Sequence, residues 1–212
     1  MTEQPESTVP ADPASTDPEL SAHELNDQMA VRAAKRQAAQ DAGMAPYPVD
    51  VHRTTTLAAV REQFGQLEAG EETEHVVTVA GRVVHVRNTG KLCFATLQEG
   101  DGTRLQAMLS KANVGDDSLA QWKALVDLGD FVAITGRVIS SRRGELSVMA
   151  DSWTMASKAL RPLPTMHKEL NEETRVRQRY LDLIVRQEAR DVVLTRSTIT
   201  RTVRPVSYTH LR

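Results

Sequence analysis

An aromatic side chain and an amide lie on two neighbouring strand-like segments within Gly90–Gln106, where a Gly- and Asp-rich turn joins the segments. Phe94 belongs to the first segment and Gln106 to the second. Proteins hold unpaired bases by stacking them on aromatic rings and by hydrogen-bonding their edges with polar side chains. The pair therefore predicts a binding place for an unpaired base. Strand alternation lets Phe94 point to either face, so a core aromatic is the competing interpretation.

Cations beside this stretch could contact the phosphates of a nucleic acid. Arg87 and Lys91 flank the first segment, and Arg142 and Arg143 lie in a turn at 140–144. Charged residues beside turns are commonly just solvated. Solvation is therefore the alternative for all four, and it is the favoured interpretation for the pair in the 140–144 turn.

Three further cations fall on one side of an alanine-rich stretch. The capping box Ser21–Glu24 predicts a helix start, because its Ser and Glu side chains can satisfy free backbone N–H groups. The helix should run to about Asp41, with Gly43 as its stop. Its cationic side is either a solvated face or a contact surface for RNA phosphates. The three cations are Arg32, Lys35 and Arg36.

Composition and charge limit the class of protein. No apolar run reaches the roughly 18 residues of a membrane span, and no basic start followed by an apolar core predicts a secretory signal. The single cysteine, Cys93, can form neither an internal disulfide nor a zinc site, which fits a cytoplasmic location. Residues 1–28 carry seven acids and no Lys or Arg, whereas 159–204 carry ten Lys and Arg against six acids. The net charge of −2 therefore does not exclude a polyanionic partner.

Five strand-like segments and one helix follow one another between residues 76 and 149. Three strands, a helix and two strands is the order of an OB-fold barrel, whose face around strands two and three commonly binds oligonucleotides. OB-folds also bind sugars and proteins, so the order alone predicts only a nucleic-acid-binding module. The strands are expected at Val76–Arg87 with a bend or bulge at Gly81, Leu92–Gln98, Arg104–Leu109, Phe131–Ile139 and Glu145–Met149, and the helix at Ser118–Val126 with Leu119, Trp122 and Leu125 facing inward.

Further elements are expected on both sides of the barrel. A short helix should span about Leu57–Leu67, and the strands should end after Asp151. Two prolines make Leu160–Pro164 a stiff, extended linker. A helix should then start near Asn171 with an apolar stripe, and another should cover 187–204. The stripe residues are Val176, Tyr180, Leu183 and Ile184, and the second helix carries Val192, Ile199 and Val203 on one side.

Four strings carry a family resemblance: GRVVHVRNTGKLCFATLQEGDGTRLQ, DLGDFVAITGRVISSRRGELSV, KALRPLP and RVRQRYLDLI. Together, in their order and spacing, they closely resemble the bacterial lysyl-tRNA synthetase family. The resemblance implies a class II aminoacyl-tRNA synthetase whose N-terminal OB-fold binds the anticodon of tRNA-Lys. It also implies a C-terminal antiparallel-sheet domain that activates lysine with ATP and Mg²⁺ and attaches it to the tRNA, in a cytoplasmic homodimer.

The resemblance also implies roles for individual residues. Phe94 matches the aromatic on which the family stacks the central anticodon base, and Gln106 matches the amide that reads that uridine. Arg87 matches a first-strand arginine near the anticodon loop. Residues 196–204 match the first half of the family's dimer-interface motif. The interface residues expected on that helix are Val192, Ile199 and Val203.

The resemblance breaks after Arg204, where the family continues its helix into a glycine and a strand but this sequence reads PVSYTHLR. We therefore expect a foreign tail after a truncated α+β class II catalytic domain. Such a chain would hold no complete site for ATP, lysine or Mg²⁺ and no catalytic residue, so it should be inactive alone although its family is enzymatic. The expected organisation is a disordered tail at 1–20, helices at 21–74, the OB-fold at 75–157, the linker and catalytic-domain start at 158–204, and the foreign tail at 205–212.

Two other interpretations stay open. One is a free-standing OB-fold RNA-binding module, against which the apolar stripe of the helix near Asn171 speaks, since a finished module has no use for it. The other is a related class II synthetase for aspartate or asparagine, which shares the barrel and the central uridine. The N-terminal helix, the RPLP linker and RQRYLDLI favour lysine.

Overall fold

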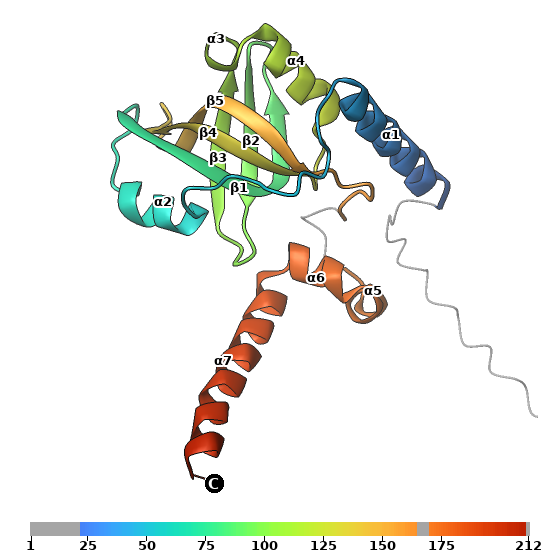
Figure 1. Ribbon diagram of the computed structural model, residues 1–212, viewed down its shortest axis with the longest axis vertical. Coiled ribbons are helices and arrows are strands. Elements are labelled where there is room, and N and C mark those ends of the chain that lie inside the picture. The colour runs from blue at the N-terminus through green and yellow to red at the C-terminus, as the bar shows by residue number, and fades with distance from the viewer. Residues whose placement is uncertain (1–21, 165–169, 211–212) are drawn as a thin grey trace, which may run out of the picture.

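The computed structural model describes residues 22–164 and 170–210, and its centre is a five-stranded barrel (Figure 1). The expected disordered tail at 1–20 and the cap residue Ser21 lie outside the described residues. The strands are β1 (Glu72–Asn88), β2 (Leu92–Gln98), β3 (Arg104–Ser110), β4 (Phe131–Ser140) and β5 (Leu146–Ser157). The helices are α1 (Ala22–Asp41), α2 (Leu57–Phe64), α3 (Lys111–Val114), α4 (Asp116–Leu125), α5 (Glu172–Arg177), α6 (Arg179–Val185) and α7 (Gln187–His210).

The barrel closes in the strand order β1-β2-β3-β5-β4. Neighbouring strands pair antiparallel, except that β3 and β5 run parallel. Helices α3 and α4 fill the connection between β3 and β4 (Figure 1). Five strands in this order, with a helix before the fourth, form an OB-fold. The predicted fold class is confirmed for the barrel and its flanking helices.

Alternation along β2 decides which side chains fill the barrel. Cys93, Ala95 and Leu97 are at most 1% exposed, whereas Phe94 and Thr96 lie half-buried on the outer face. Burial raises the pKa of the Cys93 thiol, so this side chain stays protonated and packs as a small apolar group. The interpretation of Phe94 as a core aromatic is therefore wrong.

Helix α4 packs against the barrel with the three residues that its spacing predicts. Leu119, Trp122 and Leu125 are 3%, 1% and 7% exposed. Trp122 meets Trp153 of β5 edge to face with ring centroids 5.1 Å apart, a favourable aromatic geometry. The indole Nε1 of Trp153 donates to Ser118 Oγ at 3.1 Å. These contacts fix the helix to β5.

The bulge of β1 does not fall at Gly81. The β1–β2 register shifts between Val83 and His85, so Val84 is the extra residue. Gly81 stays in the regular pairing of β1 with β4. Its lack of a side chain serves packing instead, because a Cβ there would lie 3.0 Å from the Cβ of Leu97.

Strand β5 continues to Ser157, so the expectation that the strands end after Asp151 is wrong. The register between β4 and β5 shifts at Asp151, which is an extra residue in the pairing. A bulge of this kind interrupts the two-residue alternation that marks a strand in the sequence. Beyond it the alternation resumes, with Trp153 and Met155 buried.

The helices differ from the sequence expectation in four places. Helix α2 ends at Phe64 rather than near residue 67, and the single turn α3 was not expected. The helix that begins after Asn171 is broken at Gln178 into α5 and α6, because Gln178 has φ −116° and ψ 57°. Helix α7 continues through Pro205 to His210, past the point where the family resemblance stops.

A buried ionic cluster attaches α1 to the barrel. Lys158 Nζ lies 2.6 Å from a carboxylate oxygen of Asp127 and 2.7 Å from one of Asp130. Lys35 of α1 contacts the other oxygen of Asp127 at 2.6 Å, and Arg32 donates to the carbonyl of Ala159 at 3.1 Å. Burial by itself raises the pKa of Asp127, but the hydrogen bonds and charges of Lys158 and Lys35 outweigh it, and the net shift is downward.

The C-terminal helices contact the tip of the β2–β3 hairpin (Figure 1). Gln98 Nε2 donates to the carbonyl of Ile184 at 3.1 Å, and Gln187 Nε2 donates to the carbonyl of Asp101 at 3.2 Å. The neighbouring Gly102 has φ +91°, and a Cβ there would lie 2.0 Å from Gln187 Oε1. The turn therefore requires glycine both for its backbone conformation and for this contact.

Candidate nucleic-acid interface

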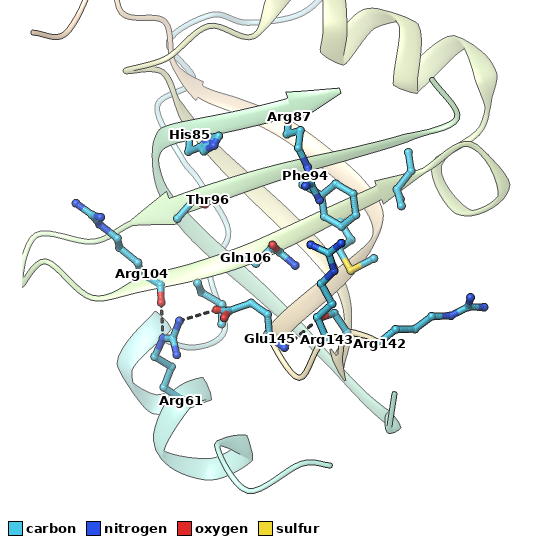
Figure 2. A pocket seen from close by; sticks show the side chains of 14 residues that line it. Arg61, His85, Arg87, Phe94, Thr96, Arg104, Gln106, Arg142, Arg143 and Glu145 are labelled. Atoms are coloured by element: carbon cyan, nitrogen blue, oxygen red, sulfur yellow. Dashed lines mark hydrogen bonds and ion pairs between the residues drawn. The ribbon is translucent and has the colours of Figure 1, made fainter. Parts of the chain in front are cut away.

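A cleft of about 1050 Å³ lies on the outer face of β1, β2 and β3 and is bordered by the β4–β5 turn (Figure 2). Phe94, Gln106 and Arg87 all line this cleft. Each occupies an outward-facing position of its strand, and the three strands are neighbours in the barrel. The structure therefore brings into one cleft the three side chains that the sequence and the family resemblance selected.

Arg87 and Phe94 form a cation–π pair at one end of the cleft. The two residues face each other across β1 and β2, and the guanidinium carbon lies 4.6 Å from the ring centroid. The ring quadrupole attracts the cation and orients both side chains. The pair thus places a positive charge against the aromatic ring inside the cleft.

Cross-strand pairing arranges the cleft floor in two rows. Arg87, Phe94 and Met108 are aligned across β1, β2 and β3 in the first row. Thr96 and Gln106 are aligned in the second row, two residues along each strand. Residues in adjacent rows are diagonal neighbours, within reach of long side chains. A base stacked on Phe94 therefore has its edge within reach of the Gln106 amide.

Glu145 and Arg61 border the cleft opposite the aromatic ring. Arg61 of α2 forms an ion pair with Glu145 at 3.2 Å and also donates to the carbonyl of Arg104 (Figure 2). The link ties α2 to the start of β5 and to β3. Both side chains are about half exposed, at 42% and 53%, so Glu145 keeps access to the cleft.

Arg142 and Arg143 line the cleft from the β4–β5 turn. The sequence favoured simple solvation for them, and they are indeed exposed. Closure of the barrel, however, places their turn beside the face that carries Arg87 and Phe94 (Figure 2). The cleft therefore gathers cations from several elements around one aromatic ring, a charge distribution suited to a polyanion.

Four of the cleft residues that sequence reasoning did not select show two different reasons for the omission. His85 and Thr96 share strand parity with Arg87 and Phe94, so alternation alone could have identified them. Arg61 and Glu145 come from elements that reach the cleft only through barrel closure and the docking of α2. No local signal in the sequence predicts that placement.

The other cations named as phosphate contacts lie away from the cleft lining. Arg32 and Lys35 bind Ala159 and Asp127 of the protein itself. Arg32 and Lys35 thus attach α1 to the barrel. The sequence predicts only a solvated face or a surface for phosphates and does not predict this role. Arg36 Nε is buried without a partner among the described residues. Lys91 is exposed in the β1–β2 turn.

Helix α7 exposes the apolar side that the resemblance links to an interface. Val192, Ile199 and Val203 are 51%, 57% and 55% exposed. Their spacing of seven and four residues keeps them on one side of the helix. This surface is separate from the cleft, which α7 does not line.

Within 22–164 and 170–210, no group of three or more His, Cys, Asp and Glu side chains is close enough to hold a metal ion. The same part of the chain contains no helix with the length and apolar content of a membrane span.

Comparison with known proteins agrees with the cleft. Residues 77–156 match the tRNA anti-codon family model, described as an OB-fold nucleic acid binding domain. The chain is 61% identical to the lysine–tRNA ligase of Kineococcus radiotolerans over 88% of its own length and 37% of the relative's. For the lysine–tRNA ligase of Mycolicibacterium gilvum the identity is 60%, over 85% of this chain and 36% of the relative.

A more distant relative extends the same match. The lysine–tRNA ligase of Moorella thermoacetica is 43% identical over 84% of this chain and 35% of its own length. The chain thus spans little more than a third of the length of the curated relatives that it matches. High identity over most of the chain, together with the anticodon-type OB-fold, assigns it to the lysine–tRNA ligase family, whose amino-terminal region it matches.

Proposed function

We propose that the barrel binds the anticodon loop of tRNA-Lys and that the chain is the tRNA-recognising, amino-terminal part of a lysine–tRNA ligase. The observation that carries the proposal is the outward-facing ring of Phe94, held by Arg87 at 4.6 Å in a cleft whose next row presents Gln106. Single-stranded loops are read by stacking splayed bases and bonding their edges, and this cleft supplies both kinds of group.

In this proposal the central anticodon uridine stacks on Phe94, and Gln106 bonds its edge. Arg87, Arg142 and Arg143 contact the loop phosphates, which position the RNA without reading its sequence. Lys91, beside the cleft, and the α1 cation Arg36 are secondary candidates for the tRNA backbone. The cleft selects the tRNA, and the chemistry takes place elsewhere.

The attachment of lysine to the tRNA is proposed for the full-length protein, and the cleft takes no part in that chemistry. From the family resemblance we propose that the full-length protein activates lysine with ATP and Mg²⁺, and no step of that reaction is assigned to the residues described here. We place the protein in the cytoplasm, with tRNA-Lys and lysine as partners and α7 contributing Val192, Ile199 and Val203 to a homodimer. The proposed units are helices at 21–74, the OB-fold at 75–157 and the linker with the start of the next domain at 158–204.

The test compares two aromatic residues that have the same kind of neighbour. Phe131 lies under Arg82 at 4.3 Å, as Phe94 lies under Arg87 at 4.6 Å, but Phe131 is not part of the cleft lining. We expect Phe94→Ala to weaken binding of a tRNA-Lys anticodon stem–loop by about 5- to 150-fold, which corresponds to the 1–3 kcal/mol of one base stack. Phe131→Ala should leave the affinity within about twofold.

Filter binding at one fixed salt concentration measures both variants, with circular dichroism as a check of folding. Equal losses of affinity in the two variants would mean that the stack is not the recognition element. A second RNA in which the central uridine is abasic tests the same contact from the other side. Phe94→Ala should cost nothing with that RNA, because no base is present to stack.

A further inference from the structure

Ser147 of β5 lies directly beneath the cleft and faces Gln106 across the parallel β3–β5 pairing. It is 0% exposed. Its hydroxyl oxygen has two close polar neighbours: the side-chain amide of Gln106 at 2.9 Å and the main-chain carbonyl of Glu145 at 2.9 Å. A buried hydroxyl is expected to satisfy its hydrogen-bonding groups, and this one does so with these two contacts.

Counting hydrogens fixes the orientation of the Gln106 amide. A carbonyl only accepts, so the single hydrogen of the Ser147 hydroxyl goes to Glu145 O. The Ser147 oxygen must then accept, and it is the Gln106 Nε2–H₂ group that donates to it. If the amide were reversed, one of the two 2.9 Å contacts would join two oxygens without a hydrogen between them. The Gln106 carbonyl oxygen, Oε1, is therefore left on the cleft side.

The β4–β5 turn holds this arrangement in place. Ser141 N donates to Glu145 O at 2.9 Å, and Glu145 N donates to Ser141 Oγ at 3.0 Å. Both main-chain polar groups of Glu145, including the carbonyl that receives the Ser147 hydroxyl, are thus hydrogen-bonded to Ser141. Gly144, with φ +80°, provides the tight return that this pairing needs. Among the described residues, no partner lies within hydrogen-bond distance of Gln106 Oε1.

We propose that Ser147 is a positioning residue for base recognition: it holds the Gln106 amide so that an acceptor oxygen, and not a donor, faces the bound base. This inference deepens the proposed function and rests on it. An acceptor selects a base that presents a ring N–H at its edge. Uridine does so at N3, whereas cytidine has an acceptor at N3 and 3-methyluridine has a methyl group there.

The test measures how well the full 212-residue chain discriminates between RNAs. Three anticodon stem–loops are compared that differ only in the central base: uridine, 3-methyluridine or cytidine. The unaltered protein should bind the uridine RNA most tightly. Ser147→Ala should reduce that preference by about two- to tenfold, the range of one hydrogen bond. Ser147→Thr, which keeps the hydroxyl, should retain it.

A double-substitution cycle separates positioning from a general structural effect. In a Gln106→Leu background, Ser147→Ala should change neither affinity nor preference further, because it acts only through Gln106. An equal loss of preference with and without Gln106 would overturn the proposal, and so would an unchanged preference in Ser147→Ala. Both outcomes are measured with Ser147→Ala and Gln106→Leu alone, so the test does not depend on whether Ser147→Thr folds.

The result also separates this inference from the proposed function. If the unaltered protein prefers uridine and Phe94→Ala weakens binding, the proposed anticodon binding stands. The double-substitution cycle then decides only whether Ser147 positions Gln106. If the unaltered protein shows no preference among the three RNAs, both the anticodon reading and the role of Ser147 are overturned.

Discussion

Replacement of Lys158 by methionine tests how α1 and the end of β5 are held on the barrel. The Lys158 side chain is 1% exposed, and its ammonium group contacts the Leu125 carbonyl at 2.8 Å, Asp127 at 2.6 Å and Asp130 at 2.7 Å. An ammonium group has three donors, so all of them are used. Methionine fills a similar volume without charge, and the substitution therefore removes the cation rather than the packing.

The expected loss follows from the burial of Asp130. Its side chain is 0% exposed, and without Lys158 its carboxylate remains buried with no opposite charge. Removing one partner of a buried pair typically costs about 3–5 kcal/mol. Backbone N–H groups of Asp127 and Ala159 still donate to Asp130 at 2.8 Å each, which places the expected loss near the lower end, at about 3 kcal/mol.

Lys111→Met is the matched control. Lys111 pairs with Asp116 at 2.7 Å, but the two side chains are 45% and 71% exposed, so the expected loss is about 0–1 kcal/mol. Urea unfolding, followed by the fluorescence of the two core tryptophans, measures both variants. Losses that agree within about 0.5 kcal/mol would refute the reasoning, because burial is the only difference on which it depends.

Two further predictions concern charge. In the double variant Arg142→Ala, Arg143→Ala, the plot of log affinity against log salt for a tRNA-Lys anticodon stem–loop should become less steep by about 1.4, which is 0.7 per lost phosphate contact. An unchanged slope would place both arginines outside the RNA contact. The pKa of Asp127 is lowered in the folded state, since its two lysine partners outweigh the opposing effect of burial. The contribution of Asp127 to the free energy of unfolding is therefore fully present above the unfolded pKa of about 3.9 and is lost as pH falls through the lower folded value. In Asp127→Asn the free energy of unfolding should thus fall less steeply with pH below about pH 4. Equal acid slopes for the two proteins would contradict this assignment.

Local alternation separated the two faces of β2 but did not decide which of them fills the barrel. Cys93, Ala95 and Leu97 are small or apolar and fill the barrel, which leaves Phe94 and Thr96 outside. The period of two fixes this division wherever pairing is regular. It also explains why the strand order, and with it the OB-fold, followed from the sequence before any long-range contact was known.

Alternation fails where a strand carries an extra residue. In β5, Asp151 shifts the register in the middle of the strand, so the two-residue pattern in the sequence breaks there although the strand continues to Ser157. In β1 the same happens at Val84, although Gly81 carries the stronger local signal for a bulge. Which residue bulges is decided by the packing of the partner strands, and this information is not local.

Some residues of the candidate site could likewise be predicted from local pattern, and others depend on long-range pairing. Parity and the family resemblance selected Phe94 and Gln106, and both residues line one cleft in the closed barrel. Ser147 could not be selected this way, because its contact with Gln106 depends on the parallel pairing of β3 with β5. That pairing joins strands separated by two helices and β4, and it exists only in the closed barrel.

The β2–β3 hairpin links the cleft to the C-terminal helices. Arg104, which lines the cleft, donates to Gln98 Oε1 at 2.9 Å, and Gln98 Nε2 donates to the Ile184 carbonyl at 3.1 Å. The oxygen of the buried Gln98 amide is therefore bonded to the cleft residue Arg104, and its nitrogen is bonded to α6. The linker at 160–164 has no regular structure, so it cannot fix the helices on the barrel by itself. The hairpin that presents Phe94 and Gln106 is thus hydrogen-bonded to both α6 and α7.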